Sequence, residues 1–75
     1  MVFETIQDML CQCLGCDPSR VAPDTVLLED LECTAEDLDD VLLGVEEEYG
    51  VAVPDGFLTP RVTVADLVRL VEEAL

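Results

Sequence analysis

The chain has 75 residues and a formal net charge of −15, since three arginines face eighteen Asp and Glu and there is no Lys or His. A folded chain of this size buries only about 60% of its unfolded surface, so residues 1–75 form one small domain whose core is built mainly from Leu and Val. The charge excludes nucleic acid and anionic membranes as partners and favours basic ones.

We expect that the first ten residues, MVFETIQDML, are not a signal peptide. They lack a basic stretch and a continuous apolar run, and no apolar segment in the chain approaches the roughly 18 residues of a membrane span. We therefore expect a cytoplasmic protein with reduced thiols.

Residues 2–14 are predicted to form an amphipathic helix that ends near Gly15 and Asp17-Pro18. At about 100° per residue, one arc of this helix is apolar. It carries Val2, Phe3, Ile6, Met9, Leu10, Cys13 and Leu14.

The segment CQCLGC at 11–16 resembles metal-ligand spacing. On a helix, however, Cys11 and Cys13 lie about 200° apart and cannot share one tetrahedral ion. With no His and only Cys33 elsewhere, we expect no metal site. We expect Cys13 and Cys16 to face the core and Cys11 to face solvent.

Residues 16–33 have no sustained period and contain two prolines, which predicts a long loop held to the core by Val21, Val26, Leu27 and Leu31. Residues 34–49 are predicted to form the second main helix, begun by Thr34 or Cys33 and stopped by Gly50. Its apolar stripe consists of Leu38, Val41, Leu42, Val45 and Tyr49.

The segment VAVPDGFLTPR at 51–61 can hold only a short or irregular helical turn. Thr63 and Asp66 then form a capping-box-like start for the last helix, whose stripe runs from Val64 to Leu75. The predicted fold class is all-α: a bundle of three main helices plus one short helix, with the longest loop between the first two main helices.

The tract EDLECTAEDLDD at 29–40 holds seven acids and no base. It does not fit a calcium loop, because a count from Asp37 places Val41 and Leu42 at the fifth and sixth positions. No pairing of a nucleophile with a base and no glycine-rich phosphate loop is found. We expect no enzymatic activity.

Four segments, in this order and spacing, resemble the acyl carrier protein family over nearly all of the chain: LGCDPSRV at 14–21, EDL at 29–31, VEEEYGVAVPD at 45–55 and VTVADLVRLV at 62–71. The resemblance implies an acyl-carrier-like bundle that carries thioesters on a 4′-phosphopantetheine arm, in fatty-acid, polyketide or nonribosomal-peptide synthesis. In that family the arm is attached to the serine of an Asp-Ser-Leu motif at the start of the second helix.

Counting from either side brings that motif onto Thr34-Ala35-Glu36, so Ala35 stands at the serine position. Alanine has no hydroxyl, and the arm expected for the family cannot be esterified there. Three explanations remain open: a natural relative that lost the arm, a carrier whose serine was replaced by design, or attachment elsewhere. Thr34 is better explained as a helix cap. Cys33 is better explained as a small apolar residue than as a thioester nucleophile, because neighbouring acids disfavour its thiolate.

The resemblance also implies docking on basic surfaces of synthase or acyl-transfer enzymes, and on a phosphopantetheinyl transferase, by a monomer. The expected partner-binding residues are Asp37, Asp40, Leu43, Glu46 and Glu47. Among them Leu43 is an apolar residue predicted to be exposed, and Glu36 stands where the family usually has leucine. The alternative is a non-carrier interaction or regulatory module that kept the acidic helix and lost the arm.

Overall fold

The computed structural model describes all residues from Met1 to Leu75 and contains helices but no strands. The elements in chain order are α1 (Val2–Leu14), the 3-10 turn η1 (Pro18–Arg20), α2 (Leu27–Asp30), α3 (Ala35–Tyr49) and α4 (Val64–Ala74). The predicted all-α bundle with three main helices, one short helix and a long loop after the first helix is confirmed. None of these helices has both the length and the apolar character needed to cross a membrane.

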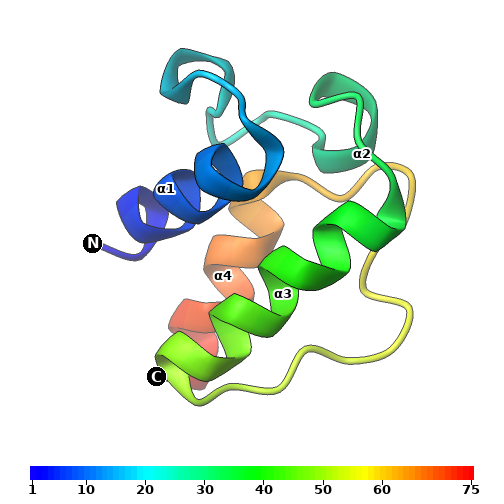
Figure 1. Cartoon of the computed structure of the whole chain (residues 1–75). Coiled ribbons are helices and arrows are strands. Elements are labelled where there is room, and N and C mark those ends of the chain that lie inside the picture. The colour runs from blue at the N-terminus through cyan, green and yellow to red at the C-terminus, as the bar shows by residue number, and fades with distance from the viewer.

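α1 is the central packing element, since it contacts both α3 and α4. Figure 1 shows α1 passing across one end of the bundle, while α3 and α4 run down from it in the same general direction. The core between these helices is purely aliphatic. Its buried residues are Ile6, Leu10, Val21, Leu27, Leu31, Leu38, Val41, Leu42, Val45, Val62, Val64, Leu67 and Val71.

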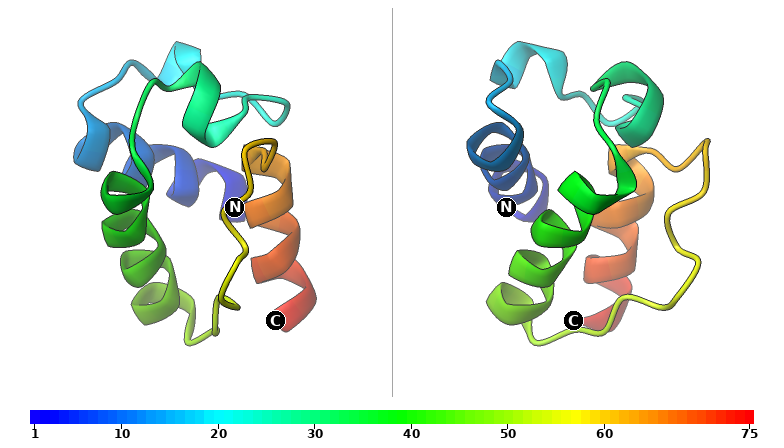
Figure 2. Two further views of the ribbon diagram at one scale, coloured as in Figure 1. Left: turned by 90° about the vertical axis from the view of Figure 1, so that its right-hand side faces the viewer. Right: turned by 45° about the vertical axis from the view of Figure 1, so that its right-hand side comes forward.

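The parallel course of α3 and α4 dictates the path of residues 50–63. α3 has 15 residues, so it is about 22 Å long at 1.5 Å per residue. The connection must return along this length to reach the start of α4, as both views in Figure 2 show. The helical turn expected within residues 51–61 is therefore absent: the segment has only isolated turns, because an extended chain covers more distance per residue than a helix does.

The short helix lies in the α1–α3 loop instead, at Leu27–Asp30. Its start is held by Asp30, whose Oδ2 accepts a hydrogen bond from the Val26 N–H at 2.8 Å. An isolated antiparallel bridge pairs Val26 with Thr63, and the Leu27 N–H donates to the Val62 carbonyl at 2.9 Å. The loop is thus fixed to the segment that leads into α4.

Thr25 is the one polar residue of the buried set, at 7% exposure. Its Oγ1 accepts from the Ala22 N–H at 2.8 Å and donates to the Arg20 carbonyl at 3.1 Å. With both functions of the hydroxyl satisfied, burial of Thr25 costs little. Thr25 therefore links residues 20 and 22 of the long loop by hydrogen bonds beneath the surface.

The predicted orientations of two cysteines are wrong. Cys13 is exposed, whereas Cys11 is half-buried against the core. The reason is that the chain after Gly15 folds back over the Gln7 side of α1, where Gln7 Nε2 donates to the carbonyls of Pro18 and Val21 at 2.9 and 3.1 Å. Cys11 lies one turn after Gln7 and is covered by the same segment. Cys16 is half-buried against the core as expected.

Candidate functional site

The start of α3 is a capping box at the protein surface. Thr34 is the N-cap: its Oγ1 accepts from the Asp37 N–H at 3.2 Å, and Asp37 Oδ2 accepts from the Thr34 N–H at 3.2 Å. The predicted role of Thr34 as a cap is confirmed. Ala35 follows as the first helical residue and is exposed.

Two backbone N–H groups at this helix start have no partner within the protein. The capping box uses the N–H of Asp37, and the Leu38 N–H donates to the Thr34 carbonyl at 3.2 Å. Ala35 and Glu36 are exposed, and their N–H groups have no hydrogen-bond acceptor within the protein. The positive end of the α3 dipole is therefore open to solvent at Ala35.

The segment that leads into this start is tightly turned. Glu32 has φ 52°, the only positive φ at a residue other than glycine. A left-handed conformation at such a residue stores backbone strain. The turn changes the direction of the chain between α2 and α3, so that α3 begins at the surface.

Cys33 precedes this helix start, and its side chain is directed toward the core rather than into solvent. Its Sγ donates to the Leu27 carbonyl at 3.2 Å, and the side chain packs against the core. Burial raises the pKa of the Cys33 thiol, and the negative charge of Asp37 raises it further. The neutral thiol thus prevails at neutral pH, as predicted, although thiols at helix N-termini are commonly acidic.

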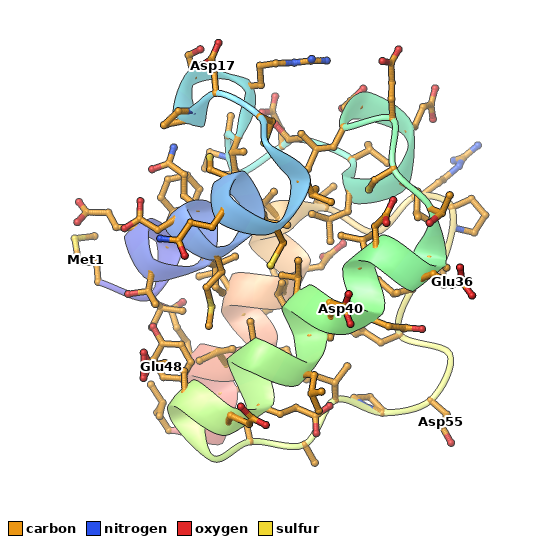
Figure 3. The ribbon with its side chains drawn as sticks, viewed as in Figure 1. Met1, Asp17, Glu36, Asp40, Glu48 and Asp55 are labelled. Carbon is orange, nitrogen blue, oxygen red and sulfur yellow. The ribbon has the colours of Figure 1, made fainter.

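The exposed side of α3 carries one large apolar side chain among acids. We call Glu36, Asp40, Leu43 and Glu47, which are all exposed, the outer face of α3. Leu43 is 56% exposed, and the only other exposed large apolar residues are the terminal Met1 and Leu75. Figure 3 labels Glu36 and Asp40 on this face. The exposure predicted for Leu43 agrees with the structure.

A groove of about 490 Å³ runs beside the outer face, between α3 and the returning connection. We call it the α3 groove. Its α3 wall consists of Ala35, Asp39, Asp40, Leu42, Leu43 and Glu46, and its second wall consists of residues 53–58. Asp55, which is labelled in Figure 3, lies on the loop that forms this second wall. The groove is mixed in character, with apolar residues on both walls and four acids.

The structure separates the five predicted partner-binding residues into two groups. Asp40, Leu43 and Glu46 line the α3 groove, and Glu47 lies on the outer face next to them. Asp37 lies on the opposite flank of α3, about 120° around the helix from Leu43, and its carboxylate serves the capping box. Asp37 is exposed but does not line the α3 groove.

Two contributors to the groove were not predicted. Asp39 lies four residues after Ala35 on the same flank of α3, a spacing that could have indicated it. The second wall, with Val53, Phe57 and Leu58, follows from the path of residues 50–63 and has no periodic signal. No group of three or more Cys, Asp or Glu side chains is arranged to hold a metal ion.

Comparisons with known proteins identify relatives over almost the full chain, although no family model matches the sequence. It is 34% identical over 74 residues to the acyl carrier protein of Thermotoga maritima, a match that covers 99% of this chain and 91% of that one. It is 31% identical to the acyl carrier protein of Helicobacter pylori strain G27, over 96% of this chain and 92% of the other. The acyl carrier protein of Campylobacter curvus is 28% identical, with coverages of 96% and 94%.

Proposed function

Because the chain belongs to the acyl carrier protein family, we propose that it docks on basic patches of synthase or acyl-transfer enzymes through the outer face of α3 and the adjoining α3 groove. The family consists of carriers rather than enzymes. The observation that carries the proposal is Leu43, 56% exposed and flanked by Asp40, Glu46 and Glu47 on neighbouring turns of α3.

The physical argument rests on charge and on one apolar contact. A formal charge of −15 steers the chain toward a positive surface and increases the association rate. Leu43 then offers an apolar anchor beside a groove that a partner side chain can enter. Arg or Lys side chains around that entry would meet Asp40, Glu46 and Glu47. We expect the chain to act in the cytoplasm as a monomer.

The 4′-phosphopantetheine arm expected for the family does not fit the residue at its attachment position. We assign that position to Ala35, the first residue of α3, where an exposed helix start with open N–H groups would favour a phosphodiester. A methyl group cannot form the phosphoester bond. The neighbouring hydroxyl of Thr34 accepts the Asp37 N–H, so it serves the helix cap. The chain as written therefore docks without an arm of its own.

Two histories lead to such a chain: a carrier whose serine was replaced, or an interaction module that kept the acidic helix. The Ala35→Ser variant distinguishes the two histories, because only a former carrier should regain modification by phosphopantetheine. We expect the variant, incubated with a phosphopantetheinyl transferase and coenzyme A, to gain the mass of one phosphopantetheine at residue 35. An unmodified variant that remains folded would favour the interaction module.

The same reaction measures docking when further changes are added to Ala35→Ser. Leu43→Ala with Glu47→Lys should lower kcat/KM for the transfer by about tenfold or more, since one apolar contact and one ion pair are lost and a repulsion is added. The matched control is Glu72→Lys on α4, which is exposed and changes the net charge equally. We expect less than about a threefold effect from it. Equal losses in both variants would show that net charge alone acts and would contradict docking through the outer face of α3.

A further inference from the structure

Cys11 and Cys16 lie side by side at the end of α1. Their Sγ atoms are 4.0 Å apart, with Cys16 as donor, and both side chains are half-buried. Cys13 lies between them in sequence but is exposed. The helical twist places Cys13 about 200° from Cys11, so it cannot reach the same thiol.

The local fold brings the two thiols together. Gly15 ends α1 in the left-handed conformation, φ 69°, and its N–H donates to the Cys11 carbonyl at 2.8 Å. This turn directs Cys16 back over the covered side of α1. The hydrogen bonds from Gln7 to Pro18 and Val21 hold the following residues on that side. The closeness of the two thiols therefore follows from the helix stop and is supported by the loop beyond it.

We infer that Cys11 and Cys16 form a reversible disulfide when the protein meets a low-molecular-weight disulfide such as oxidised glutathione. A disulfide needs its sulfur atoms at about 2.05 Å, so the pair must approach by roughly 2 Å. Rotation about the Cα–Cβ bonds supplies part of this approach. Cys16 lies outside the helices, where a small backbone shift breaks no helical hydrogen bond.

The step is two successive thiol–disulfide exchanges. One cysteine thiolate attacks a sulfur of the small disulfide, its S–S bond breaks, and one small thiolate leaves. The second cysteine thiolate then attacks the protein sulfur of the mixed disulfide and releases the second small thiolate. The protein loses two electrons and two protons, and the small disulfide is reduced to two thiols that take up those protons.

The reaction should be slow at neutral pH. Burial raises the pKa of the Cys11 thiol, as do the hydrogen bond with Cys16 and the charges of Cys16, Asp8 and Asp17. Thiolate is the attacking species. Oxidation is therefore best assayed at alkaline pH, where more of the Cys11 thiol is ionised than at neutral pH.

Tryptic digestion can identify the cysteines that pair in the unaltered protein. Cleavage after Arg20 places Cys11, Cys13 and Cys16 in one peptide and Cys33 in another. Cys33 is the competitor, since Cys16 contributes to the electrostatics of its thiol. After oxidation we expect the tryptic peptide 1–20 to lose two hydrogens by mass spectrometry. A covalent link between peptides 1–20 and 21–61 would assign the partner to Cys33 and overturn the inference.

Two matched variants then resolve the pair within peptide 1–20. The variant with Cys13→Ser and Cys33→Ser keeps Cys11 and Cys16; the variant with Cys16→Ser and Cys33→Ser keeps Cys11 and Cys13. The first should close its internal disulfide at least about tenfold faster than the second, which should accumulate glutathione adducts instead. Equal rates, or adducts alone on the first variant, would contradict the inference.

The thermal midpoint gives a second readout of the same bond. A bridge from Cys11 to Cys16 restricts the unfolded chain, so the midpoint should rise by about 5 °C on oxidation and return on reduction. An oxidised protein with a lower midpoint would show that the native geometry does not accommodate the bond. The inference does not depend on docking or on residue 35, so its failure would leave the proposed function untouched.

Discussion

The two capping boxes of this protein use the same residues at the same spacing, yet one helix start is closed and the other is open. At α4, the box of Thr63 and Asp66 is supplemented by the long loop: the Val64 and Ala65 N–H groups donate to the carbonyls of Thr25 and Pro23, each at 2.9 Å. At α3, the box of Thr34 and Asp37 stands alone. Identical local chemistry therefore produces a structural anchor in one place and an accessible end in the other.

The first residue of each helix differs accordingly. Val64 is fully buried, whereas Ala35 is exposed. A group attached at position 64 would have to displace the core, but a group at position 35 would extend into solvent. The position that the family resemblance assigns to its arm is thus the one whose surroundings would allow it.

Substitution of the first residue of each helix, Val64 in α4 and Ala35 in α3, should give the largest difference in stability between the two helix starts. Val64→Ala removes two buried carbon atoms and leaves a cavity, so the free energy of unfolding should fall by about 2–3 kcal/mol. Ala35→Val, at the exposed start, should change it by less than about 0.5 kcal/mol. Urea unfolding followed by circular dichroism measures both. A loss above about 1 kcal/mol for Ala35→Val would mean that the α3 start is packed more closely than its exposure indicates.

Removal of the N-cap hydroxyls should also destabilise the protein more at α4 than at α3, but the difference in unfolding free energy should be smaller. Thr63→Ala leaves the Asp66 N–H without its acceptor in a half-buried site, and we expect a loss of about 1.5–2 kcal/mol in the free energy of unfolding. Thr34→Ala exposes the corresponding N–H to water, so we expect about 0.5–1 kcal/mol. Matched Thr→Ser variants keep the hydroxyl and should lose less at both sites. Equal costs for the two alanine variants would erase the distinction between the closed and the open start.

The smallest expected effect is a pH dependence from Cys33, which precedes the open start. The pKa of its thiol is raised in the folded state, and in the unfolded state it is near 8.5. Below that value the thiol is protonated in both states, and its contribution to stability is fully present. As the pH rises further, the unfolded state loses its proton first, so stability falls through the folded pKa.

Urea unfolding at pH 7.5 and at pH 9.5, compared between the unaltered protein and Cys33→Ser, isolates this contribution. We expect the variant to lose less stability than the unaltered protein over this interval. A larger loss in the variant would indicate that the open helix end stabilises the Cys33 thiolate more than burial disfavours it.

Much of the fold follows from periodicity and stop signals in the sequence. The apolar stripe of α3 and its end at Gly50, a left-handed C-cap with φ 65°, were both predicted. So was the exposure of Leu43, because a helical angle alone separates it from Leu42 and Val45. These features depend only on residues a few positions apart.

The features that were missed depend on contacts between distant segments. The short helix at Leu27–Asp30 is supported by the hydrogen bond from Leu27 to Val62, which no local pattern reveals. The covered position of Cys11 depends on a loop folding back onto α1. The second wall of the α3 groove depends on the parallel course of two helices. The candidate site could therefore be placed on one helix from sequence, but the depth of the groove beside it could not.

The bridge between Val26 and Thr63 gives the long connection after α1 an unexpected mechanical property. Because the connection is fastened near its middle, it behaves as two short spans, each with a small entropy of closure. Added residues would be tolerated most readily within either span, whereas cutting the chain beside the fastening point would release the beginnings of two helices at once.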